Sequence, residues 1–294
     1  MSQAPLKILI TGRNGQVSQE LQKVLAGSAE LLVLGSAELD LSQPQKIADS
    51  VRALRPDLII NPAAHTAVDQ AESEEALAMA INAEAPKALA QVAAELDIPL
   101  IHYSTDYVFD GSKAGPYQDD DATNPLGVYG ASKLAGENAI RAVGGKYLIL
   151  RTSWVYSSHG RNFLLTMQRL LQEKPHMRIV ADQIGAPTWA GTIAGTTAQL
   201  VQHWRDGKAG AWGTYHLTGT GETSWFGFAE EIGRHLKAKG KPCAELEPIP
   251  SSAYPTPAAR PLNSRLDCSR LEREWNVRLP EWRDALNECL AEQA

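Results

Sequence analysis

The sequence predicts an α/β protein built on a doubly wound parallel sheet. Short, fully apolar runs alternate with longer stretches of helical periodicity through the first half of the 294-residue chain. Strands that are buried on both faces have this continuous apolar character, and helices provide the crossovers that parallel strands need. A glycine-containing turn directly follows the first apolar run, which is typical of sheets that bind a ligand at their carboxyl edge. The predicted architecture is therefore Rossmann-like.

Five apolar runs are expected to form the sheet, with helices between them. The expected strands are residues 8–10, 31–34, 58–60, 100–104 and 148–150. The expected helices cover about residues 16–26, 74–96 and 128–143. One more helix is expected after Ser42, which suits an N-cap and precedes Pro44 in the first turn.

The second half of the chain has a looser pattern. Five prolines lie between Pro248 and Pro261, a segment that suits neither a helix nor a central strand. We expect residues 1–155 to form a dinucleotide-binding domain, to which elements of about 190–235 return. Residues 156–294 are expected to form mainly a smaller substrate-binding lobe over the carboxyl ends of the strands, where ligands of such sheets bind.

Composition excludes several classes of partner. A net charge of −6 argues against nucleic acid or an anionic membrane as a main partner. No run approaches the roughly 20 apolar residues of a membrane helix, and no signal peptide is visible. The three cysteines have no metal-ligand spacing, and their odd number suits a reducing compartment. We therefore expect a cytoplasmic protein.

A glycine loop lies between the first strand and the first helix. Gly12 permits a tight turn, and Gly15 lets the backbone approach a pyrophosphate at the N-terminus of the helix. A plain turn without a ligand is the alternative interpretation. The residues assigned to cofactor contact in this loop are Gly12, Arg13, Asn14, Gly15, Gln16 and Val17.

Charge near the second strand bears on which dinucleotide binds. NAD sites place an acidic residue at the end of this strand to bind the adenosine ribose. Here Gly35 and Ser36 follow the strand, and the first carboxylate is Glu38. Arg13 lies in the loop, where its guanidinium suits a 2′-phosphate. We therefore expect NADPH to be preferred, with NADH possible, unless Arg13 is simply an exposed residue without a role.

The segment after the third strand is expected to border the cofactor. Ala63 and Ala64 are small enough for a cofactor to lie against the backbone there. His65 is either a proton relay or a hydrogen-bonded structural residue, and His102 in the fourth strand is interpreted as structural. The further cofactor assignments, which include two residues after the second strand, are Asp40, Leu41, Ala63, Ala64 and His65.

Tyr129 and Lys133 are four residues apart, so on a helix they share one face. A free phenol has a pKa of about 10, and lowering it by about 3 units requires roughly 4 kcal/mol. One ammonium at about 4 Å supplies this amount at an effective dielectric constant of about 20. The pair can therefore transfer a proton near neutral pH. Such a spacing also arises by chance, and the upstream Thr105 and glycine loop argue against chance here.

These elements follow one another in a specific order. The chain contains Gly12-x-x-Gly15 after a strand, then Asn61-x-Ala63-Ala64, Ser104-Thr105-Asp106-Tyr107 and Tyr129-x-x-x-Lys133. In this order they resemble the extended short-chain dehydrogenase/reductase family, and in particular its sugar-nucleotide members. Narrower matches lie in residues 63–69, 151–156, 182–188 and 252–266, so the resemblance covers nearly the whole chain.

The resemblance implies a reaction. NAD(P)H would reduce the C4 ketone of dTDP-4-dehydro-L-rhamnose to give dTDP-L-rhamnose, the activated sugar for bacterial surface polysaccharide. It implies that Tyr129 protonates the C4 alkoxide, that Lys133 lowers the pKa of Tyr129 and binds the nicotinamide ribose, and that Thr105 donates a hydrogen bond to the same oxygen. The residues expected around the dTDP-sugar are Val68, Thr105, Asp106, Tyr107, Trp154 and, at its pyrophosphate, Arg260. Tyr107 and Trp154 could equally be core aromatics, and Arg260 an ordinary surface arginine.

The chain departs from the resemblance at a metal site. Some members of the family are thought to dimerise through a magnesium ion held by three glutamates. Glu20 and Glu292 fit two of these positions, but the third is Ala190 or Gly191, which offer no carboxylate. We therefore expect no bridging Mg²⁺, and a monomer or a weak homodimer.

Two other functions stay open at this stage. One is a nucleotide-sugar epimerase or dehydratase, which would retain its NAD. The other is a binding module that resembles the non-catalytic regulatory subunit of methionine adenosyltransferase. The complete set of Thr105, Tyr129 and Lys133 disfavours the second function.

Overall fold

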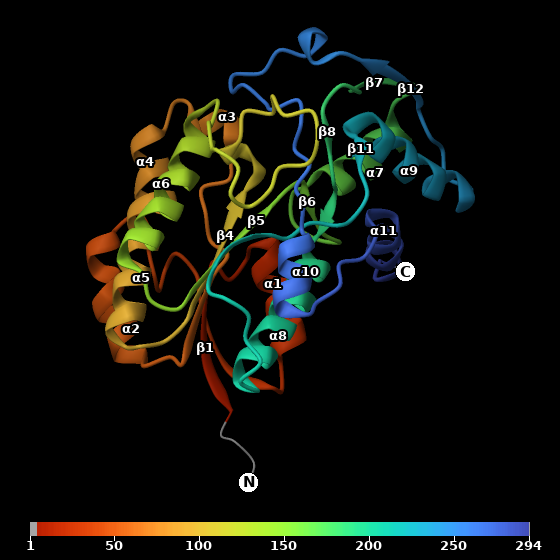
Figure 1. Cartoon of the computed structure of the whole chain (residues 1–294). Coiled ribbons are helices and arrows are strands. Elements are labelled where there is room, and N and C mark those ends of the chain that lie inside the picture. The colour runs from red at the N-terminus through yellow and green to blue at the C-terminus, as the bar shows by residue number, and fades with distance from the viewer. Residues whose placement is uncertain (1–4, 294) are drawn as a thin grey trace.

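The computed structural model describes residues 5–293, and its centre is a sheet of parallel strands (Figure 1). The strand order is β10-β5-β4-β3-β1-β2. The bounds are Leu6–Thr11 for β1, Ala29–Leu34 for β2, Leu58–Asn61 for β3, Leu100–Thr105 for β4, Tyr147–Thr152 for β5 and Gly213–His216 for β10. The first five contain the five expected runs, so the predicted doubly wound sheet is confirmed. The sixth, β10, pairs with β5 and extends the sheet from the second half of the chain.

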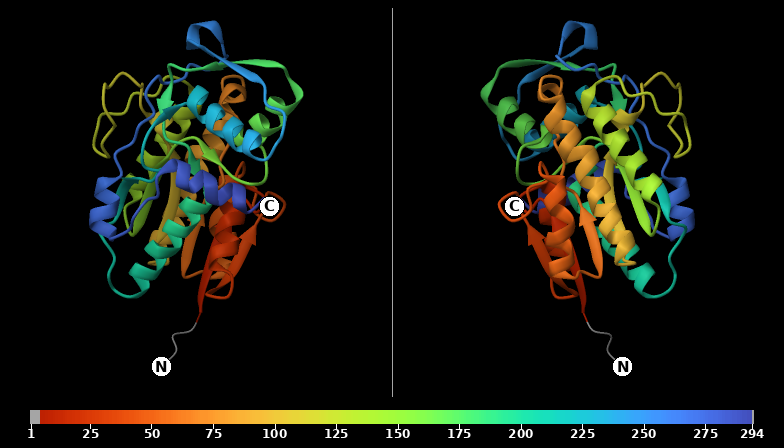
Figure 2. Two further views of the ribbon diagram at one scale, coloured as in Figure 1. Left: turned by 90° about the vertical axis from the view of Figure 1, so that its right-hand side faces the viewer. Right: turned by 90° about the vertical axis from the view of Figure 1, so that its left-hand side faces the viewer.

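Helices cover both faces of the sheet (Figures 1 and 2). On one face lie α1 (Gln16–Leu25) and α8 (Ala190–Arg205), and on the other lie α2 (Ile47–Leu54), α5 (Ala85–Glu95) and α6 (Val128–Val143). Successive residues of β1 serve opposite faces: Ile8 and Ile10 pack towards α1 and α8, whereas Leu9 packs towards α2 and α5. Each strand must therefore be apolar on both sides, which explains the continuous apolar runs.

The direction of winding changes between β1 and β3. From β1 the chain first moves outward to β2 and then returns to place β3 on the other side of β1. The connections at the carboxyl ends of β1 and β3 therefore diverge. In open α/β sheets, this switch point is where ligands bind.

The long helix expected over residues 74–96 contains a π-helical segment. The structure has α4 (Glu75–Met79), a π turn over Ala80–Glu84, and then α5. Pro86 has no N–H with which to continue the α-helical ladder. The carbonyl of Asn82 is closely approached by α6 instead, since a Cβ on Gly136 would lie 2.1 Å from this oxygen. Single π turns inside α-helices often mark functional sites.

The expected N-cap at Ser42 is wrong. A 3-10 turn over Pro44–Lys46 precedes α2, and neither element is capped by Ser42. The Ser42 hydroxyl and N–H instead donate to Oδ1 of Asp40, at 2.7 and 2.9 Å. An aspartate two residues upstream competes for these donors and forms a local turn.

Part of the C-terminal half forms an upper lobe with its own apolar core (Figure 1). Its helices are α7 (Phe163–Glu173), α9 (Trp225–Ala238) and α11 (Trp282–Ala291). Its strand pairs are β6 (Val155–Tyr156) with β9 (Thr188–Trp189), β8 (Ile184–Gly185) with β11 (Thr223–Ser224), and β7 (His176–Val180) with β12 (Glu245–Ile249). Of the elements in residues 190–235, α8 and β10 pack with the central sheet, whereas α9 packs against α7. Pro248 lies in β12, in a sheet of only two strands, which a proline tolerates.

Within residues 5–293, no helix combines the length and the hydropathy needed to cross a bilayer.

Candidate active site

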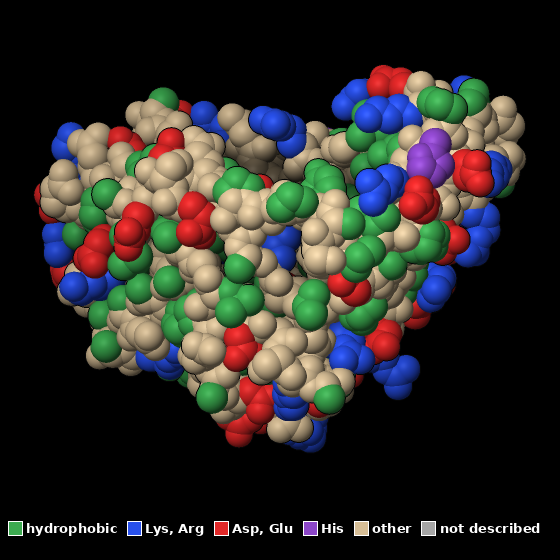
Figure 3. All heavy atoms as spheres, turned by 90° about the horizontal axis from the view of Figure 1, so that it is seen from above, with side chains coloured by type: hydrophobic (Ala, Val, Ile, Leu, Met, Phe, Trp, Pro, Cys, Tyr) green, Lys and Arg blue, Asp and Glu red, His purple; other side chains and the backbone are tan. Residues whose placement is uncertain are grey.

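The predicted site residues gather at the carboxyl edge of the sheet. Gly12 follows β1, Ala63 follows β3, and Thr105 is the last residue of β4. Tyr129 and Lys133 lie on α6, whose bounds match the predicted helix. Figure 3 views the molecule from this edge, where the surface is notched between the sheet-containing part and the lobe.

The glycine loop closely approaches the segment after β3. Gly12 has a φ of +69°, and a Cβ on it would lie 2.8 Å from Cβ of Ala63. Only glycine therefore fits this position. The N–H of Gly15 donates to the Gly12 carbonyl at 2.8 Å, and Gly15 precedes α1 without a side-chain cap. The first N–H groups of α1 are thus available to a pyrophosphate, so these residues fit a dinucleotide.

The other loop residues have structural contacts of their own. The Asn14 carbonyl accepts a hydrogen bond from the Gln19 side chain, and Val17 packs against the core. Oε1 of Gln16 accepts from Ser157 at 3.1 Å and from Asn162 at 2.8 Å. Gln16 therefore connects α1 to the lobe, and the cofactor contacts of these three residues stay predictions.

Arg13 lies at the end of β2, but it is paired. Its guanidinium donates to the Val33 carbonyl at 2.8 Å and forms an ion pair with Glu38, also at 2.8 Å. The Glu38 carboxylate also accepts from the N–H of Gly35 at 3.0 Å. A carboxylate therefore does lie at the end of β2, because the chain turns after Gly35 and brings Glu38 next to it. Arg13 and Glu38 together form the edge where an adenosine ribose would lie.

Asp40 and Leu41 are occupied in the structure. Asp40 accepts hydrogen bonds from Ser42 and from Gln43, and these bonds lower the pKa of its carboxyl. The Leu41 side chain is buried in the core between the sheet and α2. Their role in cofactor binding remains a prediction that neither side-chain contact supports.

Thr105 and Tyr129 are close together. Oγ1 of Thr105 donates to Oδ1 of Asp106 at 2.9 Å and accepts from the N–H of Tyr107 at 3.2 Å. The rings of Tyr107 and Tyr129 meet edge to face, with centroids 5.5 Å apart. Burial raises the pKa of Tyr129 to about 12, and a hydrogen bond with Thr105 works in the opposite direction.

Lys133 is buried and points to the sheet. Its Nζ donates to the Tyr103 carbonyl at 2.7 Å and lies 3.3 Å from Nε2 of His102. Burial lowers the pKa of Lys133 to about 8, which the charge of Glu137 opposes. The structure therefore differs from the expectation that Lys133 lowers the pKa of Tyr129. The amine is directed at Tyr103 and His102, so burial dominates at the phenol.

A buried polar chain connects Lys133 to the glycine loop. Nδ1 of His102 lies 2.9 Å from Nδ2 of Asn61, and Oδ1 of Asn61 accepts from the Thr11 hydroxyl at 2.5 Å. All four residues are buried: Thr11 and Asn61 end β1 and β3, His102 lies within β4, and Lys133 lies on α6. Sequence reasoning interpreted His102 as a structural residue and assigned no role to Asn61. The available signal was that polar side chains end two apolar strands and that a histidine interrupts a third.

Asn82 was also missed. Its Oδ1 accepts from the N–H of His65 at 2.8 Å, while its Nδ2 donates to the His65 carbonyl and to Ser132, both at 3.0 Å. It thereby connects the segment after β3 to α6, one residue before Lys133. His65 also lies 3.1 Å from Glu74 through Nε2. The signal was a lone asparagine in an alanine-rich helix, four residues before Pro86.

Asp106 is a buried acid with a free oxygen. Only 2% of its surface is exposed, and Oδ2 has no hydrogen-bond partner among the described residues. Burial raises the pKa of Asp106 to about 6, against hydrogen bonds from Ser264 and Thr105. A buried polar atom without a partner costs about 1–3 kcal/mol. A donor on a ligand would remove this cost.

Val68 and Arg260 lie near one another, but Arg260 is paired. The helix α3 (Val68–Ala71) begins at Val68 and carries Asp69. The Arg260 guanidinium binds the Asp69 carboxylate through two hydrogen bonds of 3.0 and 2.9 Å. Arg260 therefore holds the segment 251–265 onto α3, and its expected contact with a pyrophosphate stays a prediction.

Trp154 adopts a strained backbone two residues beyond β5. Its φ is +49°, a conformation that costs a bulky residue about 1–3 kcal/mol. Its indole stacks on that of Trp225, with ring centroids 3.7 Å apart and an angle of 12° between the planes. Strain of this kind persists only where surrounding contacts impose it, and it is concentrated at functional sites.

The amine of Lys23 lies between Glu20 and Glu292, the two glutamates that fit the family's magnesium site. Nζ of Lys23 lies 2.8 Å from Glu20 and 3.7 Å from Glu292, and Nδ1 of His159 lies 3.4 Å from Glu20. Ala190 and Gly191 are the first residues of α8. Residues 5–293 contain no group of three or more His, Cys, Asp or Glu side chains arranged to hold a metal.

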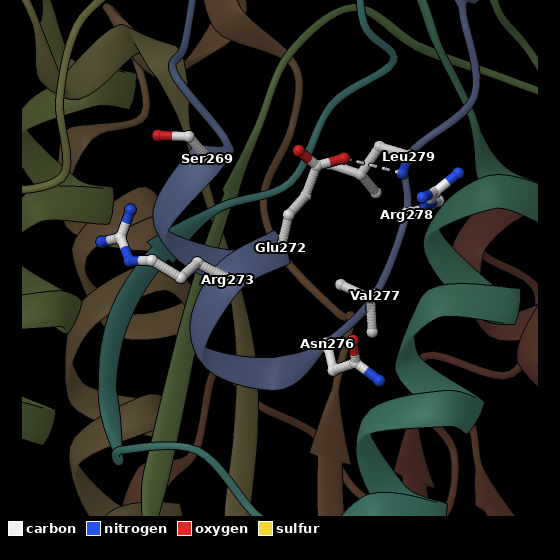
Figure 4. Close-up of a pocket in the computed structure, with 7 residues that line it drawn as sticks. All are labelled: Ser269, Glu272, Arg273, Asn276, Val277, Arg278 and Leu279. Carbon is white, nitrogen blue, oxygen red and sulfur yellow. Dashed lines mark hydrogen bonds between the residues drawn. The ribbon is translucent and has the colours of Figure 1, made fainter.

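A shallow hollow of about 430 Å³ lies beside α10 (Ser269–Trp275), away from these residues (Figure 4). The Glu272 carboxylate faces it and accepts from the N–H of Leu279 at 3.1 Å, whereas Arg273 points away. The hollow contains none of the predicted site residues.

Comparison with known proteins identifies the family. A family model described as RmlD substrate binding domain matches residues 6–294. The dTDP-4-dehydrorhamnose reductase of Burkholderia thailandensis is 47% identical over 292 residues, which cover 97% of this chain and 98% of the relative. The chain belongs to the dTDP-4-dehydrorhamnose reductase family.

Solved structures of this reductase family have the same fold. The chain is similar to the reductase of Clostridium acetobutylicum, with a TM-score of 0.91 and 36% identity, over 98% of this chain and 99% of that one. It is equally similar to the Bacillus anthracis reductase in complex with NADP, with a TM-score of 0.91 and 33% identity, over 98% and 100% of the two chains. The family, the fold and the expected NAD(P)H-dependent oxidoreductase class are thereby confirmed.

Proposed function

We propose that this chain reduces the C4 ketone of dTDP-4-dehydro-L-rhamnose to dTDP-L-rhamnose, with NADPH as the preferred cofactor. The observation that carries the proposal is that Thr105, Tyr129 and Lys133 lie at the same carboxyl edge of the sheet as Gly12 and Ala63, with Thr105 beside the phenol of Tyr129. A proton donor, a hydroxyl and an amine there can serve a ketone at the switch point of the sheet.

The cofactor site is built from backbone and small side chains. Gly12, Gly15 and the N-terminus of α1 would hold the pyrophosphate, and Ala63 and Ala64 would border the bound dinucleotide. Arg13 would face the 2′-phosphate at the end of β2. When bound, NADPH supplies the hydride that adds to C4 of the sugar.

Hydride addition leaves a negative charge on the C4 oxygen, and the chain must supply a proton. Tyr129 donates its phenolic proton to this oxygen, so that the product is an alcohol and Tyr129 becomes a phenolate. The Thr105 hydroxyl lies beside the phenol, and by turning its single proton from Oδ1 of Asp106 to the C4 oxygen it would stabilise the charge that develops. Lys133, with a pKa of about 8, is suited to hold the proton that restores Tyr129.

The sugar would lie between α3, the end of β4 and the loop after β5. We assign its contacts to Val68, Asp106, Tyr107 and Trp154, and we assign Arg260 to the nucleotide side. The free Oδ2 of Asp106 suits a sugar hydroxyl, which would satisfy a buried acceptor. Further, we propose that the enzyme works in the cytoplasm as a monomer or weak homodimer, where its free cysteines stay reduced.

The test is to follow NADPH absorbance with dTDP-4-dehydro-L-rhamnose generated in situ by upstream enzymes. We expect turnover by the wild type and a loss of kcat of at least about 10²-fold in Tyr129→Phe, because the general acid is removed without a change of packing. Tyr147→Phe, at the amino end of β5 and therefore at the opposite edge of the sheet, is the matched control and should keep its activity. A wild type without turnover, or a Tyr129→Phe variant with most of its kcat, would refute the proposal.

A further inference from the structure

Three aromatic rings are in contact in a row that ends at Trp154, with Trp154 and Trp225 stacked and Phe163 tilted by 47° against Trp225. Phe163 packs against Trp225 with centroids 4.7 Å apart, and Trp225 stacks on Trp154 with centroids 3.7 Å apart. The rings come from α7, from the start of α9 and from the loop after β5. Trp154 is half-buried at the carboxyl edge, so the lobe supports this indole from behind.

A polar contact fixes the middle ring. Nε1 of Trp225 donates to Oε1 of Gln183 at 3.1 Å, and Nε2 of Gln183 donates to Oγ of Ser251 at 2.9 Å. Gln183 is buried, so each end of its amide requires a partner. The Nε1 hydrogen bond therefore fixes the rotation of the Trp225 indole, and the contacts with Trp154 and Phe163 fix its two faces.

The short strands β8 and β11 position the two residues that contact the Trp154 indole, Gly185 and Trp225. The indole edge lies against Gly185, where an added Cβ would come within 2.8 Å of Trp154. Gly185 pairs with Thr223 in the β8–β11 ladder, and Ile184 pairs with Ser224, the residue before Trp225. The ladder thus places Gly185 and Trp225 against the indole of Trp154. These contacts hold the Trp154 backbone at its strained φ of +49°.

We propose that Trp225 and Gln183 are positioning residues for Trp154, and that they set how tightly the enzyme holds the deoxysugar of its substrate. This inference rests on the proposed function, which assigns Trp154 to the sugar. Without the stack, Trp154 relaxes to an ordinary backbone conformation, and its indole leaves the sugar site. The glycine loop and the N-terminus of α1, which would bind the cofactor, do not change.

Kinetics of matched variants test the inference. Trp225→Leu should raise the KM of the dTDP-sugar about tenfold, because an aromatic face is lost, with the KM of NADPH within about twofold of wild type. Trp225→Phe keeps a ring at this position and should recover most of the affinity. Gln183→Met keeps the side-chain length, removes both hydrogen bonds and should have an intermediate KM. Trp212→Phe, in the separate Trp212–Trp275 contact, is the control and should leave both KM values unchanged.

A spectroscopic readout reports the stack without turnover. Two indoles in contact couple their electronic transitions, so Trp154 and Trp225 should contribute to a circular-dichroism couplet, and the separate Trp212–Trp275 pair can contribute to it as well. Trp225→Phe and Trp154→Phe should remove the same part of the spectrum, and Trp212→Phe should leave that part in place. A spectrum that Trp225→Phe leaves unchanged would overturn the stacked geometry.

Trp154→Ala separates the two possible failures. If this variant keeps the wild-type KM for the dTDP-sugar, the assignment of Trp154 in the proposed function is wrong. If Trp154→Ala raises that KM but Trp225→Leu and Gln183→Met do not, the positioning role is wrong and the proposed function stands. Calorimetric titration with dTDP-L-rhamnose, which requires no turnover, should rank the variants in the same order, and a different order would contradict the inference.

Discussion

Nζ of Lys133 lies 3.3 Å from Nε2 of His102, and both side chains are buried where α6 packs against β4. Burial, with a further contribution from the charge of Lys133, holds the pKa of His102 well below its usual range, so the imidazole is neutral. The Thr11 hydroxyl donates to Oδ1 of Asn61, which directs the Asn61 NH₂ group at Nδ1 of His102. The proton of the neutral ring is therefore assigned to Nε2, so this nitrogen accepts no hydrogen bond from Lys133, and the acceptor of the ammonium is the Tyr103 carbonyl.

This relationship predicts the effect of replacing His102. His102→Leu should lower the free energy of unfolding by about 1–3 kcal/mol, because the buried Asn61 amide loses its acceptor. It should also lower kcat about tenfold, because the imidazole packed 3.3 Å from Nζ of Lys133 is replaced by a side chain of another shape and the amine shifts. His102→Gln retains a polar group and should recover part of both. Urea denaturation and NADPH turnover measure the two effects, and a His102→Leu variant that matches wild type in both would contradict this prediction.

Arg13 and Glu38 are predicted to control the choice of cofactor. Arg13→Ala should lower kcat/KM for NADPH about tenfold and leave that for NADH nearly unchanged, since only NADPH carries the 2′-phosphate. Glu38→Gln frees the guanidinium and removes a negative charge, so it should increase the preference for NADPH. Steady-state kinetics with both cofactors measure this. A wild type that prefers NADH would refute the electrostatic explanation.

Asp106 is predicted to give the reaction an acidic limb. Its pKa is raised to about 6, so kcat/KM for the sugar should fall as the pH decreases through about 6 and the carboxylate loses its acceptor capacity. Asp106→Asn should flatten this limb. A limb of unchanged position in that variant would exclude Asp106 as its origin.

The raised pKa of Asp106 makes the stability of the fold depend on pH. The folded-state pKa lies above the usual value of 3.8, so the protonated carboxyl favours the folded state, and this contribution is lost as the pH rises through about 6. Asp106→Asn should therefore gain stability relative to wild type as the pH rises from about 4 to about 6, by up to about 3 kcal/mol, and keep this gain at higher pH. Thermal unfolding across this range measures the difference, and a constant difference would contradict it.

The buried pair of Glu137 and Arg151 holds α6 against β5. Arg151 donates twice to the Glu137 carboxylate, at 2.9 and 2.7 Å. Burial acts to raise the pKa of Glu137, but Arg151 outweighs it and the pKa is lowered below its usual 4.5. This stabilisation is therefore present above about pH 4.5 and is lost as the pH falls through the folded-state pKa.

Removing one partner leaves a buried charge. Glu137→Gln should cost about 3–5 kcal/mol at pH 7 and make the stability less dependent on acid pH. Glu95→Gln, which breaks an exposed pair with Arg52, is the matched control and should have little effect. Equal effects of the two substitutions in urea unfolding would show that burial does not govern the contribution of Glu137.

Much of the fold could be predicted because the signals are local. The strands β1 to β5 are apolar on both sides, and the bounds of α6 match the predicted helix, since neighbouring residues determine both patterns. Gly12 could be recognised from the turn that it must make. The error at Ser42 has the opposite origin, because Asp40 competes for the donors of that serine.

What only the tertiary structure decided is which side chains meet. Glu38 forms an ion pair with Arg13, and Asp69 binds the guanidinium of Arg260, which is 191 residues away along the chain. His102 and Trp225 join the site through partners on other elements. By itself the sequence determined the sheet, the glycine loop and the helix that carries Tyr129, because local periodicity and turn chemistry specify them. Charge pairing, burial and ring stacking depend on distances between segments remote along the chain, and these distances exist only in the folded protein.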